Sequence, residues 1–164
     1  MKITNKKKYG ITFLILVVTI VFALILATAV TISFENIIDS TNKKEFANEI
    51  NALQKLVEQY HFMNNKYPVT ENEIEISLNG MTLGEKQQFI NEPGYENGRI
   101  IVKEINLVEA DVDNITRGIK ADGDTLDVYT VSENTGTVYY LKGVEIEGIN
   151  HYSLTTELKK SLDI

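Results

Sequence analysis

The N-terminal part of the chain contains a continuous apolar stretch. Residues 11–34 (ITFLILVVTIVFALILATAVTISF) run for 24 positions without a charged residue, a glycine or a proline. At about 1.5 Å per residue, this stretch predicts a helix of roughly 36 Å, long enough to cross the hydrocarbon core of a bilayer. The preceding residues 1–10 carry four lysines, and such a cationic flank stays on the cytoplasmic side. The pattern predicts a single-pass membrane protein whose C-terminal domain lies outside the cytoplasm.

Three interpretations of this stretch are open. It is a plain signal anchor of an extracellular binding protein, or a secretory signal peptide cleaved after Ala29, because Ala27-Thr28-Ala29 has the small-x-small pattern of a cleavage site. Against the signal peptide, apolar residues continue through Phe34, where a mature secreted chain usually turns polar. In the third interpretation the chain is cut after Gly10, and the whole apolar helix is retained.

The next stretch, residues 35–66, predicts an amphipathic continuation of the same helix. It contains no glycine or proline, and its apolar residues recur at spacings of three and four. Pro68 ends the helix because proline lacks a backbone donor and disfavours helical geometry at the residue before it. The predicted buried face, which should pack on a sheet, consists of Phe46, Ile50, Leu53, Val57 and Tyr60.

Residues 67–164 predict a β-rich extracellular domain. Short apolar segments between turn residues predict strands at 99–107, 126–132, 137–142, 144–149 and 151–154, and short helices at 84–92 and 155–162. An antiparallel sheet would bury the apolar face of the amphipathic half-helix. The predicted fold class is therefore α+β, with a long N-terminal α-helix (apolar half plus amphipathic half) packed on a C-terminal antiparallel β-sheet domain.

The distribution of charge and the absence of cysteine exclude several classes of function. The formal net charge is −7, and all 23 acidic residues lie at or beyond Glu35, so that 12 bases face 23 acids once the lysine-rich leader is set aside. So acidic a surface repels phosphate backbones, and no general nucleic-acid binding is expected. Without cysteine there is no disulfide, thiolate metal site or thiol nucleophile.

Four features occur together in about the first 70 residues. They are the basic leader ending at Gly10, the start Ile11-Thr12-Phe13-Leu14-Ile15, the apolar helix with its amphipathic continuation, and the exit YHFMNNKYP at residues 60–68. In this combination the chain resembles the type IV pilin and pseudopilin superfamily. The resemblance implies that a prepilin peptidase cuts between Gly10 and Ile11 and methylates the Ile11 amine, and that the filament core starts with residues 11–15.

The same resemblance implies a structural role without a cofactor. An inner-membrane assembly platform would move the chain from the lipid bilayer into a type IV pilus, a competence pilus or a type II secretion pseudopilus, where other pilin or pseudopilin subunits are its partners. One residue departs from the family pattern, because Ile15 stands where the family usually carries a glutamate that neutralises a neighbour's N-terminal amine. A homopolymer would then bury each amine unpaired, at a cost of several kcal/mol. We therefore expect a minor, initiating or tip-type subunit.

Residues that could support catalysis or metal binding are few. Only His61 and His151 titrate near neutral pH, and the chain lacks a Gly-rich phosphate loop, a nucleophile elbow and an HExxH motif, so we do not expect an enzyme. Alternating carboxylates can converge on Ca²⁺. The weak candidates are Asp111, Asp113, Asp122 and Asp124, with Asp127 nearby. Because Thr116 stands where a calcium loop needs glycine, solvated turns are the preferred interpretation and no metal is predicted.

Overall fold

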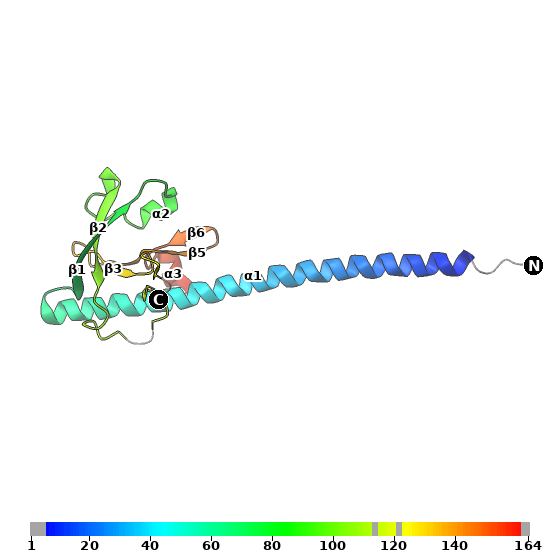
Figure 1. Cartoon of the computed structure of the whole chain (residues 1–164), viewed down its shortest axis with the longest axis horizontal. Helices are drawn as coiled ribbons and strands as arrows, with labels where there is room; N and C mark the ends of the chain where they lie inside the picture. The colour runs from blue at the N-terminus through cyan, green and yellow to red at the C-terminus, as the bar shows by residue number, and fades with distance from the viewer. Residues whose placement is uncertain (1–5, 113–114, 121–122, 162–164) are drawn as a thin grey trace, which may run out of the picture. The chain divides into compact units, whose positions relative to one another are not determined.

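The computed structural model describes residues 6–112, 115–120 and 123–161. The chain divides into two compact units, Met1–Ser40 and Thr41–Ile164. Helix α1 is assigned over Lys6–Asn64, so its residues from Thr41 onward belong to the second unit (Figure 1). In the first unit, side chains are described for residues 15–21, Ala23 and Ser40.

The second unit is an α+β domain with two small antiparallel sheets. The first sheet has the strand order β1-β2-β3-β4, and the second sheet pairs β5 with β6. The strands are β1 (Val69–Ser77), β2 (Arg99–Ile105), β3 (Tyr129–Val131), β4 (Val138–Tyr140), β5 (Val144–Ile146) and β6 (Ile149–His151). The remaining helices are α2 (Leu83–Gln87), the 3-10 helix η1 (Tyr95–Asn97) and α3 (Thr156–Ser161).

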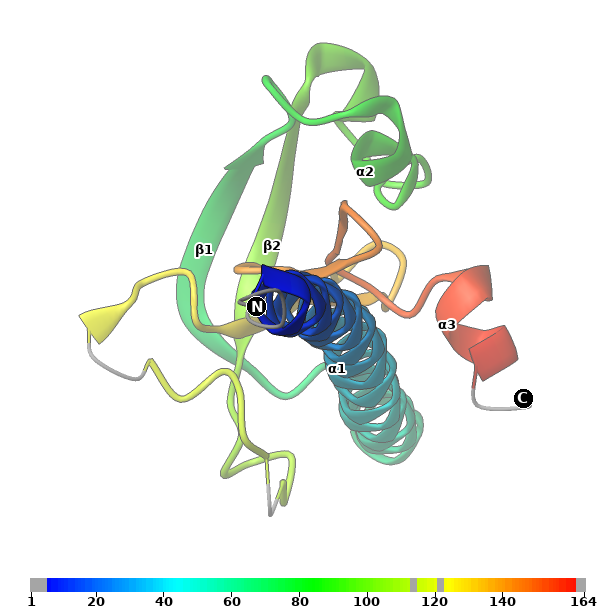
Figure 2. The same cartoon turned by 90° about the vertical axis from the view of Figure 1, so that its right-hand side faces the viewer.

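Strands β1 and β2 form the longest ladder of the first sheet and lie side by side in both views (Figure 1 and Figure 2). Their register places Ile74 opposite Val102 and Ile76 opposite Ile100, with an irregularity between Val69 and Glu73. Strand β1 has no counterpart among the predicted strands. Its sequence, VTENEIEIS, contains three glutamates, a residue type depleted in strands, and the isoleucines at alternate positions are its only apolar signal after Val69.

The strands predicted at 126–132 and 137–142 are present as β3 and β4, which pair as an antiparallel hairpin. Val131 pairs with Val138 and Tyr129 with Tyr140. The turn needs Gly136, whose φ is +71°, a left-handed conformation that costs glycine little. A Cβ atom at this position would also lie only 2.8 Å from the Tyr67 hydroxyl oxygen.

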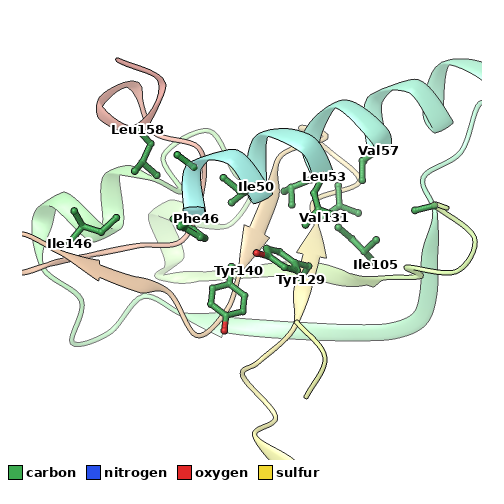
Figure 3. Close-up of a cluster of buried hydrophobic side chains, with 13 residues drawn as sticks. Phe46, Ile50, Leu53, Val57, Ile105, Tyr129, Val131, Tyr140, Ile146 and Leu158 are labelled. Carbon is green, nitrogen blue, oxygen red and sulfur yellow. The ribbon is translucent and has the colours of Figure 1, made fainter. Parts of the chain in front are cut away.

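One face of the sheet is covered by the helical segment 41–64 (Figure 3). Buried apolar side chains form one cluster between the sheet and this helix and a second cluster on the opposite face of the sheet. Val138 and Tyr140 belong to the first cluster and Tyr139 to the second, because successive side chains of a strand point to opposite faces. The helix-side cluster includes Phe46, Ile50, Leu53, Val57, Ile105, Tyr129, Val131, Val138 and Tyr140. The opposite cluster includes Leu78, Phe89, Ile100, Val102, Val128 and Tyr139. The domain therefore has apolar packing on both faces of its sheet.

The predicted fold class is wrong in its long helix. The α+β fold is built from the short helical segment 41–64 and a mainly antiparallel sheet, and the chain divides after Ser40. Among the side chains of α1 that the structure describes, the first buried one is that of Phe46, whereas the apolar side chains at 15–21 are exposed and contribute nothing to this core. The helix that packs on the sheet is therefore the short segment 41–64.

Within the described residues, no helix combines the length and the apolar character that crossing a bilayer requires. Most side chains of the predicted membrane segment, 11–34, lie outside the part of the chain whose side chains the structure describes.

Candidate functional site

The described apolar side chains of the first unit are exposed on all sides of the helix. Residues 15–21, which we call the apolar segment, include Ile15, Leu16, Val17, Val18, Ile20 and Val21, each between 43% and 56% exposed. Because successive residues of an α-helix are rotated by about 100°, four consecutive residues already point in every direction. A helix that is apolar all round is normally buried in protein or lipid. The apolar segment therefore has the surface of an element that requires a partner.

The predicted processing site lies next to this segment. Gly10 and Ile11 belong to the backbone of α1, and the side chains of the expected filament start at Ile11, Thr12, Phe13 and Leu14 lie outside the described residues. Ile15 is described and is 56% exposed. The Thr19 hydroxyl donates to the Leu16 carbonyl at 2.8 Å, which satisfies its polar group within the helix.

Four of the five residues predicted to pack on the sheet lie together in the core. Phe46, Ile50, Leu53 and Val57 are at most 1% exposed and point toward β3 and β4 (Figure 3). Tyr60 lies instead at the edge, where its hydroxyl donates to the Glu109 carboxylate.

The Glu109 carboxylate also contacts Lys66 Nζ at 2.8 Å. The hydrogen bonds from Lys66 and then from Tyr60 hold the pKa of Glu109 below its ordinary value. Tyr60 therefore anchors the loop after β2 to the end of α1, and the helix face changes from apolar packing to polar anchoring at this residue.

A second polar anchor on the same helix is Glu49. Its carboxylate accepts hydrogen bonds from the backbone N–H groups of Thr116 at 2.7 Å and Arg117 at 3.1 Å, and from the Arg117 guanidinium at 2.6 Å. Such charge-assisted contacts fix the loop at 115–118 against the helix. Beside this anchor is a mainly apolar pocket of about 480 Å³, whose lining includes Leu53, Leu56 and Ile115.

Two buried carboxylates hold the sheet to its surrounding loops. Glu92, 5% exposed, accepts from Ser132 Oγ at 2.5 Å, Thr135 Oγ1 at 2.5 Å and the Tyr139 hydroxyl at 2.7 Å. Asp127, also 5% exposed, accepts from the Gly118 N–H at 2.6 Å and the Tyr140 hydroxyl at 2.9 Å. No residue spacing in the sequence signals these partners, which lie up to 47 positions away.

Of the four weak calcium candidates, Asp124 has other partners, Asp111 is exposed, and two lie outside the described residues. Asp124 accepts from the Leu126 N–H at 2.9 Å and contacts Lys142 Nζ at 2.8 Å, and the Lys142 ammonium lowers the pKa of Asp124. Asp111 is exposed in a left-handed conformation, with φ of +54°. Asp113 and Asp122 are outside the described part. Among the described residues, no three His, Cys, Asp or Glu side chains lie close enough to hold a metal ion.

The two histidines lie in different environments. The His61 ring stacks on the Tyr67 ring with centroids 4.1 Å apart. His151 is 5% exposed, and its Nδ1 lies 3.4 Å from Thr155 Oγ1. Burial lowers the pKa of His151, and the charges that act on the imidazole are those of Glu157, Lys43 and Glu147.

His151 contributes to a pocket of about 470 Å³, which we call the polar pocket. It lies between α2 with the residues that follow it and the segment from β6 to α3. Its described lining consists of Gly84, Gln87, Gln88, Asn91, Thr137, Tyr139, Ile149, His151, Ser153, Leu154, Thr155, Thr156 and Glu157. Most of these side chains carry hydrogen-bonding groups, which distinguishes this pocket from the apolar one beside Glu49.

Comparison with known proteins gives no match. No family model, curated protein or solved structure matches the chain.

Proposed function

We propose that this chain is a pilin-like structural subunit, which assembles into a filament through its apolar N-terminal helix and displays the acidic α+β domain. The observation that supports this function is the apolar segment, whose Ile, Leu and Val side chains are about half exposed on every side of the helix. Before assembly, residues 11–34 hold the chain in the membrane, with the lysine-rich leader on the cytoplasmic side.

Burial of this segment, in lipid or against other helices, stabilises the chain relative to exposure in water. Fully burying one aliphatic side chain is worth about 1.5–3 kcal/mol, so covering the exposed half of six such side chains contributes on the order of 4.5–9 kcal/mol. A bundle of similar helices and a bilayer both provide this cover. When the segment moves from the bilayer into a helix bundle, its side chains therefore remain in apolar surroundings. This property suits a subunit that moves from membrane to filament.

The place of the subunit in the filament follows from Ile15. The described residues 15–21 and Ala23 include no carboxylate that could pair with the N-terminal amine of a neighbouring subunit. A buried unpaired ammonium costs several kcal/mol, and this cost repeats at every contact of a homopolymer. A subunit that starts the filament has no earlier neighbour to neutralise, so the chain acts as a minor, initiating or tip subunit.

The mature N-terminus of the native chain tests the proposal. Mass spectrometry of the chain from membranes and from sheared filaments should find a methylated Ile11. An intact Met1 would assign the chain to the anchored binding proteins, and a start at Val30 to the secreted proteins, and either result would overturn the proposal. The Gly10→Leu variant should keep its leader, whereas Ala29→Leu should be processed normally. A filament composed mainly of this chain would contradict the tip position.

A further inference from the structure

The polar pocket has a buried floor and an exposed rim. At the floor, the side chains of Tyr139, His151 and Ser153 are 2%, 5% and 6% exposed. The rim carries the amides of Gln87 and Asn91 on one side, and the Glu157 carboxylate with the Thr156 hydroxyl on the other. The volume of about 470 Å³ lies within the range of small-molecule sites.

The two walls of the pocket are fixed to each other by hydrogen bonds. Gln88 donates through Nε2 to the Asn150 carbonyl at 2.7 Å, and its Oε1 accepts from the N–H groups of Tyr152 at 2.7 Å and Ser153 at 3.2 Å. Glu85 accepts from Asn150 Nδ2 at 2.9 Å. Since these bonds join α2 to the segment at β6, the pocket is formed before a ligand enters, and binding does not have to order its walls.

The lining selects against charged ligands. None of the described lining residues is lysine or arginine, so an anion would meet no cation and would be repelled by Glu157. Burial keeps the His151 imidazole neutral near pH 7, because it lowers the pKa of that group. A cation would meet Glu157 but no open aromatic cage, since the Tyr139 ring is stacked on Phe89 with centroids 4.9 Å apart.

The remaining groups fit a ligand with several hydroxyls. Each amide at the rim offers both donors and an acceptor, and the His151 imidazole offers its Nε2, since its Nδ1 lies 3.4 Å from Thr155 Oγ1. Ile149 and Leu154 add an apolar patch that can cover the C–H face of a sugar ring. From this combination we propose that the polar pocket binds a neutral saccharide. The inference is independent of the N-terminal helix and holds whichever mature N-terminus the chain has.

Saturation-transfer difference NMR tests the proposal on the full chain, kept soluble in a detergent without a sugar headgroup. The probes are the methyl glycosides of glucose, galactose, mannose and N-acetylglucosamine. At least one should receive saturation from the protein, and Asn91→Ala and Glu157→Gln should each weaken its binding at least tenfold. The matched control Glu145→Gln changes an exposed residue of β5 outside the pocket and should leave binding unchanged.

Three results would overturn the proposal: no probe receives saturation, binding survives both rim variants, or tetramethylammonium binds while the glycosides do not. Gln87→Ala provides a second exposed rim variant if one of the others fails to fold. An oligosaccharide of the bound sugar then distinguishes the source of the ligand. Tighter binding of the oligosaccharide assigns the pocket to a glycan chain and equal binding assigns it to a free sugar, and both results support the saccharide class.

Discussion

Replacement of Glu92 by alanine removes the acceptor for three hydroxyl groups at once. The carboxylate of Glu92 joins the turn after α2 to the β3–β4 hairpin through Ser132, Thr135 and Tyr139. Of these three, Thr135 is exposed and can turn to water, whereas Ser132 and Tyr139 are 0% and 2% exposed. The Glu92→Ala variant therefore leaves two buried O–H donors without their acceptor.

The size of the effect follows from these two donors. A buried polar group left without a partner costs about 1–3 kcal/mol, so two such groups cost roughly 2–6 kcal/mol. The variant also no longer has to bury a carboxylate, which offsets part of this loss. We expect a net decrease in the free energy of unfolding of about 2–4 kcal/mol. In Glu92→Gln the amide oxygen remains as an acceptor, and a decrease of only about 1–2 kcal/mol is expected.

Equilibrium urea unfolding of the full chain, followed by near-ultraviolet circular dichroism of the tyrosines, measures these differences. Glu96→Ala is the matched control, because Glu96 is an exposed glutamate of the neighbouring helix η1 and its replacement should change stability by less than about 0.5 kcal/mol. If Glu92→Ala is no more destabilising than this control, the three hydroxyl contacts do not hold the hairpin.

Three further predictions concern packing, backbone geometry and pH. Ile50→Ala, at a fully buried position, should lower the free energy of unfolding by about 2–5 kcal/mol, whereas Ile101→Ala, at a position 56% exposed, should change it much less in the same urea assay. Gly118→Ala and Gly123→Ala place a side chain at φ of +75° and +77°, but only the first brings its Cβ within 2.4 Å of a buried tyrosine ring, so it should have the lower melting temperature. Because burial lowers the pKa of His151, the unfolded chain binds a proton more readily, and stability should fall as the pH drops below the ordinary pKa of 6.5. In the His151→Gln variant, the free energy of unfolding should depend less on pH between pH 8 and 5. An unchanged pH dependence in this variant would contradict the role of His151.

The local sequence pattern predicted those parts of the fold that depend on residues close together in the chain. The spacing of Phe46, Ile50, Leu53 and Val57 identifies one face of a helix, and these four side chains are buried together. The turn residues before Gly136 locate the β3–β4 hairpin. Both signals arise within a few residues, because helix and hairpin geometry repeat over such distances.

The sequence did not predict where the fold begins. Because residues 11–66 contain no glycine or proline, the sequence gives no signal for a boundary within this stretch. The start of the α+β unit at Thr41 follows only from the contacts in the structure. Strand β1 was missed for a related reason. Its glutamates make it polar as a sequence, and its pairing with β2, a strand more than 20 positions later in the chain, makes it part of the sheet.

By itself, the sequence determined the buried helix face of Phe46, Ile50, Leu53 and Val57 and the acidic character of the chain, because these properties are sums or repeats over local residues. Only the tertiary structure decided that Glu49, Glu92 and Asp127 are anchors rather than solvated acids, and that α2 and β6 enclose the polar pocket. Each of these features joins groups that are distant in sequence. Their partners are chosen by the packing of the sheet, which no local pattern contains.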